Sequence, residues 1–264
     1  MELRGKRILL TGATGGLGRA IASSLAEEGA SLVLSSRKES DLTEMEAGLP
    51  GDHAVLVSDL AEPGAGLELL SRSGDLDGMV ANAGLPGTGK LDELTSENVE
   101  RALRVNFDAP ILMTQELLRA LLAKEEGHIV LISSLSGVAV SPRSSIYNAT
   151  KFGLRGFGLA LREDLRGSGV GVSVVMPGFI RGAGMFADTG ADAPPGMGTA
   201  TPEAVGAGVV SAIHRDRSEV NVAPRRQVAA AKFAARHPEL SGKLSNGPAT
   251  KVAETMAGAQ TEKR

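Results

Sequence analysis

Short apolar runs alternate with longer stretches of mixed polarity along this chain. The runs have the length of β-strands and predict strands near residues 7–11, 31–35, 53–58, 77–81, 128–132, 170–175 and 219–222. Their apolar character suits strands that are covered on both faces of a parallel sheet. The intervening stretches carry apolar residues at helical spacing and predict crossover helices, the longest near residues 95–123 and 145–167.

This alternation predicts the α/β fold class: a doubly wound, parallel, seven-stranded sheet with helices on both faces. We assign residues 1–223 to one such domain and residues 224–264 to a C-terminal extension. The chain has 264 residues, of which 42% are hydrophobic and 22% charged, so it can bury a core of this size.

Two stretches depart from the pattern. Residues 178–200 are rich in Gly, Pro, Ala and Asp, which predicts a mobile substrate loop that acts as a lid. The extension after Pro224 carries eight Lys/Arg and three Asp/Glu, a net charge of +5, whereas the first 223 residues carry −8. A basic helix that touches a partner or a membrane surface is one interpretation of this extension, and a solvated helix or frayed tail is the other.

Composition narrows the function classes. The formal net charge of −3 gives no general attraction to nucleic acid, and the absence of cysteine excludes disulfides and a thiolate nucleophile. The N-terminal apolar run that ends at Thr11-Gly12 is too short for a signal segment or a membrane span, so we expect a soluble cytoplasmic protein with no integral membrane segment. No metal is assigned, because the histidines lack the spacing of a zinc motif: His53, His128, His214 and His237.

The most informative turn follows the first predicted strand and opens a helix: Thr11-Gly12-Ala13-Thr14-Gly15-Gly16-Leu17-Gly18. Glycines permit a tight turn and close backbone approach, and the amides and dipole of a helix N-terminus attract a pyrophosphate. The turn therefore predicts a dinucleotide site of the Rossmann type that involves Gly12, Thr14, Gly16, Leu17 and Gly18. Two glycine spacings are present, 12/16/18 and 12/15/18, and the sequence alone does not choose between them.

Tyr147 is the only tyrosine of the chain, and Lys151 lies four residues later on the same face of a predicted helix. A phenol with a pKa near 10 is a poor base at neutral pH, but a neighbouring ammonium and the positive charge of the nicotinamide in NADP⁺ favour the phenolate and lower that pKa. The pair therefore predicts proton transfer by Tyr147, with Lys151 tuning its pKa. Ser134, just past the strand at 128–132, can hydrogen-bond a substrate oxygen and stabilise charge there.

Together with Asn82-Ala83-Gly84 at the end of the fourth strand, these motifs resemble the short-chain dehydrogenase/reductase family in its single-domain form, over about residues 5–223. The resemblance implies NAD(P) as the cofactor, with Lys151 holding the ribose. It also implies that Asn106 joins a water relay with the catalytic lysine. Further implied cofactor contacts are those of Asp59 and Leu60 with adenine, and those of Pro177, Gly178 and Ile180 beneath the nicotinamide. One departure is Gly182, where the family commonly has a threonine, so a carboxamide contact is in doubt.

The end of the second strand predicts which cofactor is preferred. An acidic residue there would bind the ribose diol and repel a 2′-phosphate. Ser36 stands at that position, and Arg37 follows with a guanidinium that can pair with a phosphate. We expect NADP(H) to be preferred over NAD(H), although Gly15 lacks the basic residue that some NADP-binding relatives carry there.

These features predict an oxidoreductase that transfers a hydride between NADP(H) and a ketone or secondary alcohol, with Tyr147 as general acid/base. A nucleotide-sugar epimerase or dehydratase is an alternative that the second glycine spacing favours, and a non-catalytic NADP(H)-binding sensor or scaffold is another. The substrate's identity and the physiological direction are left open. The family resemblance also implies a homodimer or homotetramer formed through the two longest helices.

Overall fold

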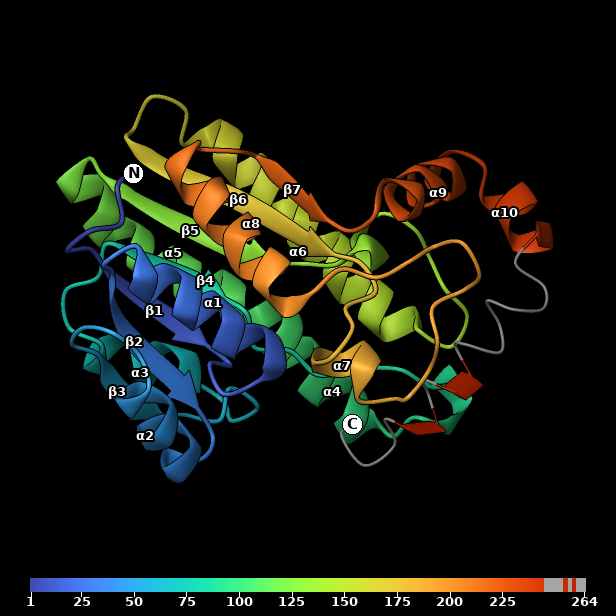
Figure 1. The fold of residues 1–264 in the computed structure, drawn as a ribbon, viewed down its shortest axis with the longest axis horizontal. Helices are drawn as coiled ribbons and strands as arrows, with labels where there is room; N and C mark the ends of the chain where they lie inside the picture. Colours follow the sequence, from blue (N-terminus) through green and yellow to red (C-terminus); the bar gives the residue numbers. More distant parts are fainter. Residues whose placement is uncertain (245–253, 256–257, 260–264) are drawn as a thin grey trace.

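The chain folds around a seven-stranded sheet in which every strand runs parallel to its neighbours (Figure 1). This computed structural model describes residues 1–244, 254–255 and 258–259. The strands are β1 (Arg7–Thr11), β2 (Ser31–Ser36), β3 (Ala54–Val57), β4 (Gly78–Ala81), β5 (Gly127–Ile132), β6 (Val170–Pro177) and β7 (Glu219–Val222). All seven lie where the apolar runs predicted them. The spatial order is β3-β2-β1-β4-β5-β6-β7, so the winding reverses between β1 and β4.

Helices connect the strands and cover both faces of the sheet, as predicted (Figure 1). The helical segments are α1 (Gly16–Glu27), α2 (Glu39–Ala47), α3 (Ala65–Arg72), η1 (Leu91–Glu93), α4 (Ser96–Leu103), η2 (Arg104–Asp108), α5 (Ala109–Lys124), η3 (Leu135–Gly137), α6 (Ser145–Asp164), α7 (Gly184–Ala187), α8 (Pro202–His214), α9 (Arg225–Arg236) and α10 (Pro238–Leu244). The single helix predicted near 95–123 is therefore three segments, because the five residues of η2 form a π-helical turn between α4 and α5.

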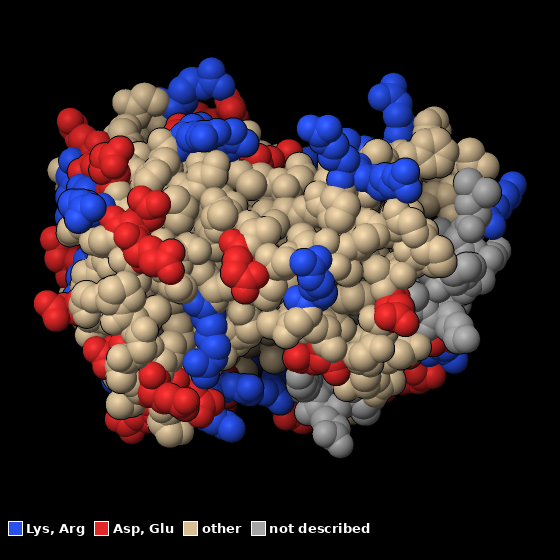
Figure 2. All heavy atoms as spheres, viewed as in Figure 1, with Lys and Arg blue, Asp and Glu red and all other residues tan. Residues whose placement is uncertain are grey.

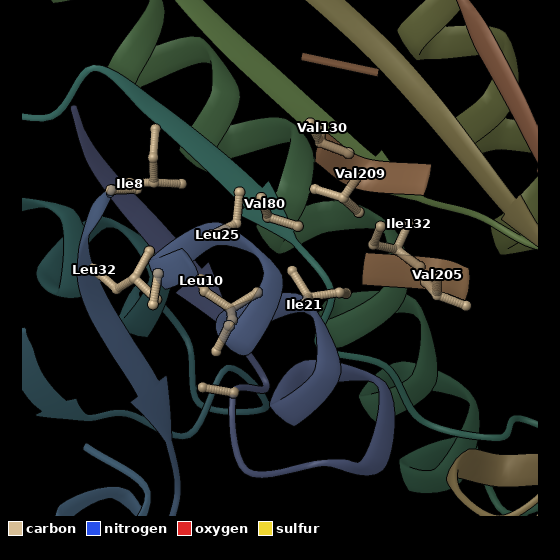
Figure 3. Packing of buried hydrophobic residues seen from close by; sticks show 14 of the residues in the cluster. Ile8, Leu10, Ile21, Leu25, Leu32, Val80, Val130, Ile132, Val205 and Val209 are labelled. Carbon is tan, nitrogen blue, oxygen red and sulfur yellow. The ribbon is translucent and has the colours of Figure 1, made fainter. Parts of the chain in front are cut away.

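Alternate residues of the strands point to opposite faces of the sheet and belong to two separate hydrophobic cores. Ile8 and Leu10 of β1 point to the face covered by α1, α2 and α8, where they meet residues such as Ile21 and Val209 (Figure 3). Leu9, between them, points to the opposite face and belongs to the core formed with α3, α5 and α6. This two-residue period on a sheet that is covered on both sides explains the continuous apolar runs of the sequence.

The C-terminal extension begins as a helix. α9 presents a row of exposed cations, and Lys and Arg side chains are visible over it in Figure 2: Arg225, Arg226, Lys232 and Arg236. Two residues of the same helix, Gln227 and Ala231, are buried. Within the described ranges no helix has the length and apolarity to cross a membrane, and no group of three His, Cys, Asp or Glu could hold a metal ion. The predicted extension's remaining residues, 245–253, 256–257 and 260–264, lie outside the described part.

Candidate active site

The glycine turn after β1 is shaped by contacts that leave no room for side chains. Gly12 has a left-handed φ of +65°, and a Cβ on Gly18 would lie 2.1 Å from the Gly12 carbonyl oxygen. A Cβ on Gly16 would lie 2.4 Å from the Cβ of Ala183. Gly15 is different, since its Cβ would meet only the Gly12 carbonyl oxygen, at 3.3 Å. Close packing therefore requires the 12/16/18 spacing and not the 12/15/18 alternative.

Hydrogen bonds join this turn to the end of β4. The Thr11 hydroxyl oxygen accepts the backbone N–H groups of Asn82 and Ala83, each at 3.1 Å. The Asn82 side-chain amide donates back to the carbonyl oxygens of Thr11 and Gly12, at 3.1 and 3.0 Å. Asn82 and Ala83 thus lie beside the turn, as predicted. Thr11 was not among the predicted site residues, although its position directly before Gly12 was a signal.

Thr14 and Leu17 lie half-buried in the same turn, at the start of α1. The Thr14 carbonyl accepts a hydrogen bond from the exposed Arg19 side chain at 3.2 Å. Gly15 is the N-cap of α1 and has no side chain that could satisfy the first amides of the helix. The helix N-terminus can therefore donate to an anion, which is the chemistry of a pyrophosphate site.

Tyr147, Ser134 and Lys151 come together at the carboxyl end of β5. Tyr147 and Lys151 lie one turn apart at the start of α6, with the Lys151 Nζ 5.6 Å from the centroid of the tyrosine ring. Ser134 follows β5 and hydrogen-bonds Tyr147. The Ser134 Oγ also donates to the Pro177 carbonyl at 3.4 Å and accepts from the Ser136 N–H at 3.0 Å. The structure thus assembles the three predicted catalytic side chains into one contact group.

Burial dominates the electrostatics of this group. Lys151 is only 4% exposed, and burial lowers its pKa to about 8, while its Nζ donates to the Ile132 carbonyl at 2.9 Å. Burial likewise raises the pKa of Tyr147, and its hydrogen bond with Ser134 offsets this in part. Without nucleotide the desolvation of the phenolate therefore decides the direction of the Tyr147 pKa, and the lowering expected with bound NADP⁺ stays a prediction.

Asn148 fixes the segment between Ser134 and Tyr147. It is 5% exposed, and its side-chain amide donates to the carbonyls of Ser136 and Ala139, at 2.7 and 3.0 Å. Its Oδ1 accepts the N–H of residue 141 at 3.3 Å. Asn148 was not among the predicted site residues, although it stands next to Tyr147 inside the tyrosine motif.

Asn106 lies in the π-helical turn η2 and is 1% exposed. Its Oδ1 accepts the Leu85 N–H at 2.6 Å, and its Nδ2 donates to the Leu85 carbonyl at 2.8 Å. Both this amide and the predicted catalytic lysine lie near Gly84, since a Cβ there would be 3.4 Å from the Asn106 Oδ1 and 3.8 Å from the Lys151 Nζ. The structure therefore places Asn106 beside Lys151 and gives it a second role, which is to fix the segment after Gly84.

The residues predicted for the adenosine end lie at the carboxyl ends of β2 and β3. The Ser36 carbonyl accepts the Ser58 N–H at 3.0 Å, which brings the two strand ends together. The Ser36 Oγ is buried without a hydrogen-bond partner among the described residues, and the neighbouring Arg37 is exposed. Asp59 accepts a backbone amide through its carboxylate at 3.0 Å, and Leu60 is 8% exposed.

The loop after β6 runs from Pro177 back across the site. Ile180 is 4% exposed and pairs with Ala200, which closes the predicted substrate loop into a narrow base. Ala183 contacts the glycine turn, as described above, and the short helix α7 lies within the loop. Gly182 has a left-handed φ of +80°, a conformation that a β-branched threonine strongly disfavours. The backbone thus accounts for the departure noted at this position.

A nicotinamide dinucleotide fits the residues present. The turn has glycines where a Cβ would collide with protein atoms, and the first amides of α1 have no side-chain cap. The unpartnered Ser36 hydroxyl and the exposed Arg37 offer polar groups at the ribose end. Lys151 supplies an ammonium at the other end that no carboxylate neutralises in an ion pair within the described residues.

The buried ammonium predicts that Lys151 destabilises the nucleotide-free protein. A folded-state pKa of about 8, below the ordinary 10.5, means that the unfolded chain binds more protons between pH 8 and 10.5, so stability rises with pH across that window. We expect Lys151→Met to raise the free energy of unfolding by about 2 kcal/mol at pH 7, after allowance for the lost hydrogen bond. Thermal melts followed by circular dichroism at pH 7 and pH 10 should show this gain shrinking as the pH rises. A variant less stable than the wild type at pH 7 would contradict the prediction.

Comparisons with known proteins agree with this geometry. A family model described as short chain dehydrogenase matches residues 6–194. The ketoacyl reductase HetN of Nostoc sp. is 34% identical over 227 residues, which cover 83% of this chain and 79% of that protein. The 3-oxoacyl-(acyl-carrier-protein) reductase FabG of Rickettsia prowazekii is 30% identical over 181 residues, which cover 69% of this chain and 75% of that protein.

Solved structures give the same result. A 3-oxoacyl (acyl-carrier-protein) reductase from Agrobacterium tumefaciens C58 with NADP bound is 26% identical, has a TM-score of 0.75, and covers 83% of this chain and 93% of its own. The glycine turn, the tyrosine-lysine pair and the preceding serine thus occur in a chain whose relatives are dehydrogenases and reductases. The chain belongs to the short-chain dehydrogenase/reductase family and is an NAD(P)-dependent enzyme of it.

Proposed function

We propose that this enzyme reversibly transfers a hydride between NADP(H) and a ketone or secondary alcohol, with Tyr147 as the general acid/base. The observation that carries the proposal is the contact group at the end of β5, in which Tyr147 hydrogen-bonds the Ser134 hydroxyl and its ring centroid lies 5.6 Å from the buried ammonium of Lys151. When bound, the nicotinamide would supply or accept the hydride. The protein's part is to bind, orient and move a proton.

The proton moves through Tyr147. A phenol is already protonated at neutral pH at its ordinary pKa, and burial raises the pKa of Tyr147 further, so Tyr147 suits the role of donor to the oxygen of a carbonyl under reduction. The Ser134 hydroxyl, already bonded to Tyr147, would orient that oxygen. The phenolate left behind would face the Lys151 ammonium, which stabilises negative charge in a dry site. In alcohol oxidation the same groups act in reverse, and Asn106 stands beside Lys151 for the proposed water relay.

A 3-oxoacyl thioester is the first substrate to test, since HetN and FabG are named as ketoacyl reductases. The loop at residues 178–200 is the proposed lid over that substrate. Its Phe179 and Phe186 rings pack with centroids 4.7 Å apart, and both side chains are half-buried, so the loop presents apolar surface of its own. An apolar lid of this kind excludes water from the reacting carbonyl.

The first test is Tyr147→Phe, which removes one hydroxyl and keeps the ring volume. We expect kcat to fall about a hundredfold or more, because the general acid is lost. Binding of NADPH, followed by its fluorescence, should change less than twofold. The far-ultraviolet circular dichroism spectrum serves as the control for folding. A well-folded variant with wild-type turnover on the best substrate would rule out Tyr147 as the acid/base.

The cofactor preference rests on Ser36 and Arg37. No carboxylate stands at the end of β2 to bind a ribose diol, and the exposed Arg37 guanidinium can form a charge-assisted pair with a 2′-phosphate. Such a pair contributes on the order of 1.5–3 kcal/mol, so the preference for NADPH should be roughly ten- to a hundredfold.

The measurement is the ratio of kcat/KM with NADPH to kcat/KM with NADH. We expect Ser36→Asp/Arg37→Ala to lower this ratio below one, because the new carboxylate binds the diol and repels the phosphate. Lys38→Ala is the matched control, since it removes the adjacent exposed cation. Equal efficiencies in the wild type, or an equal effect of the control, would refute the assignment to Arg37.

We also propose a homo-oligomer formed through α5 and α6. The outer face of α6 exposes the small residues Ala149, Gly156 and Ala160 beside Phe152, which is 40% exposed, and α5 exposes Leu112 at 47%. Gly153, in contrast, packs inward on Phe107. Small residues on an open helix face allow another helix to approach closely.

Gly156→Arg tests the oligomer, because a Cβ at this position meets no atom within 4 Å and the single subunit should tolerate the side chain. We expect multi-angle light scattering to give a dimer or tetramer for the wild type and a smaller species for the variant. A wild type that is monomeric at working concentrations would refute this proposal.

A further inference from the structure

Gln227 is a buried polar side chain in α9, the first helix of the C-terminal extension, and it is 5% exposed. Its Oε1 accepts the Phe179 N–H at 3.0 Å, at the start of the proposed lid. Its Nε2 donates to the carbonyls of Gly198 at 2.7 Å and Met197 at 3.4 Å, at the end of the lid. One amide therefore joins both ends of the lid to a helix outside the predicted catalytic domain.

We call the two ends of the proposed lid, residues 178–181 and 197–200, the loop base. Few other hydrogen bonds join these two segments. The Ala200 N–H donates to the Phe179 carbonyl at 2.9 Å, and the Arg181 N–H donates to the Ala200 carbonyl at 3.0 Å. Removal of the Gln227 amide would take a hydrogen bond from each of three backbone groups: the Phe179 N–H and the Met197 carbonyl, in half-buried residues, and the carbonyl of the exposed Gly198. Gln227 therefore contributes to holding the two ends of the loop base together.

The same amide lies next to the catalytic group. A Cβ on Gly178 would be 2.1 Å from the Gln227 Oε1, so glycine at 178 leaves the space that the amide occupies. Gly178 follows Pro177, whose carbonyl accepts the hydrogen bond from the Ser134 Oγ at 3.4 Å. A shift of the Gln227 side chain would therefore also move Gly178 and the neighbouring Pro177, which contacts Ser134.

We propose that Gln227 is a positioning residue that fixes the loop base, and with it the segment 177–180 beneath the proposed nicotinamide site. α9 then helps to position the active-site loop, although the sequence assigned this helix to a separate basic extension. The catalytic consequence rests on the proposed function. The structural consequence, an ordered loop base in the protein without nucleotide, does not.

Two substitutions separate hydrogen bonding from packing. Gln227→Met keeps a side chain of similar length and removes both the donor and the acceptor. Gln227→Glu keeps the acceptor, but it has a donor for the Gly198 carbonyl only while its carboxyl is protonated. Burial against carbonyl oxygens raises the pKa of that carboxyl, so the protonated form, which mimics the amide, is populated at mildly acidic pH. Ala229→Gly is the matched control, because it weakens the exposed side of the same helix and removes no polar contact.

The first measurement is amide hydrogen exchange of residues 178–200 in the protein without nucleotide. We expect Gln227→Met to speed exchange at the loop base about tenfold, the size expected for a net loss of one hydrogen bond. Gln227→Glu should match Gln227→Met at pH 8 and approach the wild type at pH 5.5, with rates expressed relative to the wild type at each pH. Ala229→Gly should change exchange at the loop base less than twofold.

The second measurement is steady-state kinetics of the same variants. We expect kcat to fall about tenfold in Gln227→Met and KM for the carbonyl substrate to rise, while NADPH affinity at the adenosine end changes little. Gln227→Glu should recover kcat as the pH falls, relative to the wild type, which a purely structural role would not produce. Unchanged kcat despite faster exchange at the loop base would overturn the catalytic role.

Wild-type exchange rates in Gln227→Met would overturn the proposal as a whole, and so would equal effects of Gln227→Met and Ala229→Gly. If the wild type reduces none of the carbonyls tested, the proposed function fails, and the exchange comparison alone then decides whether Gln227 orders the loop base. The two failures are therefore distinguishable.

Discussion

The hydrogen bonds between Thr11 and Asn82 are the constraint on which the site depends. They join the end of β1 to the end of β4, the two strands between which the winding of the sheet reverses. At such a reversal the connecting helices diverge to opposite faces and leave the strand ends open to a ligand. The same bonds hold the Gly12 turn against Ala83, where a side chain at residue 12 would collide with protein atoms. The absence of a side chain at Gly12 also leaves the backbone of the turn open to a ligand.

The burial of Lys151 and Tyr147 costs free energy of desolvation, which the packing of the two hydrophobic cores must offset. Lys151 is an almost fully buried ammonium without an ion-pair partner among the described residues, and its pKa falls to about 8. Burial also keeps Tyr147 protonated in the nucleotide-free protein. A strained charge state of this kind is typical of functional sites, where a group is held ready for a charge that arrives or develops during the reaction. In the proposed reaction, the negative charge that develops on the substrate oxygen and on Tyr147 would be that charge.

The proposed lid, residues 178–200, links three parts of the structure. It begins at the end of β6 beside Ser134, passes the glycine turn at Ala183, and returns to its base, where Gln227 joins it to α9. The side chains of Arg225, Lys232 and Arg236 are exposed on the same helix, whereas Gln227 is buried. The exposed cations and the buried Gln227 therefore lie on different faces of one helix. The charge of the extension indicated its exposed face but gave no sign of the contact that Gln227 makes with the loop base.

The sequence by itself determined the seven strands, the glycine turn and the four-residue spacing of Tyr147 and Lys151, because these are local patterns with a fixed period. Only the tertiary structure decided between the two glycine spacings, since the distinction between Gly15 and Gly16 depends on Ala183, far along the chain. It also decided that burial raises the pKa of Tyr147 in the protein without nucleotide, because desolvation depends on everything packed around a group. The role of Gln227 has no sequence signal at all. A buried amide is recognisable only from the distant backbone groups that it satisfies, and folding alone brings those groups together.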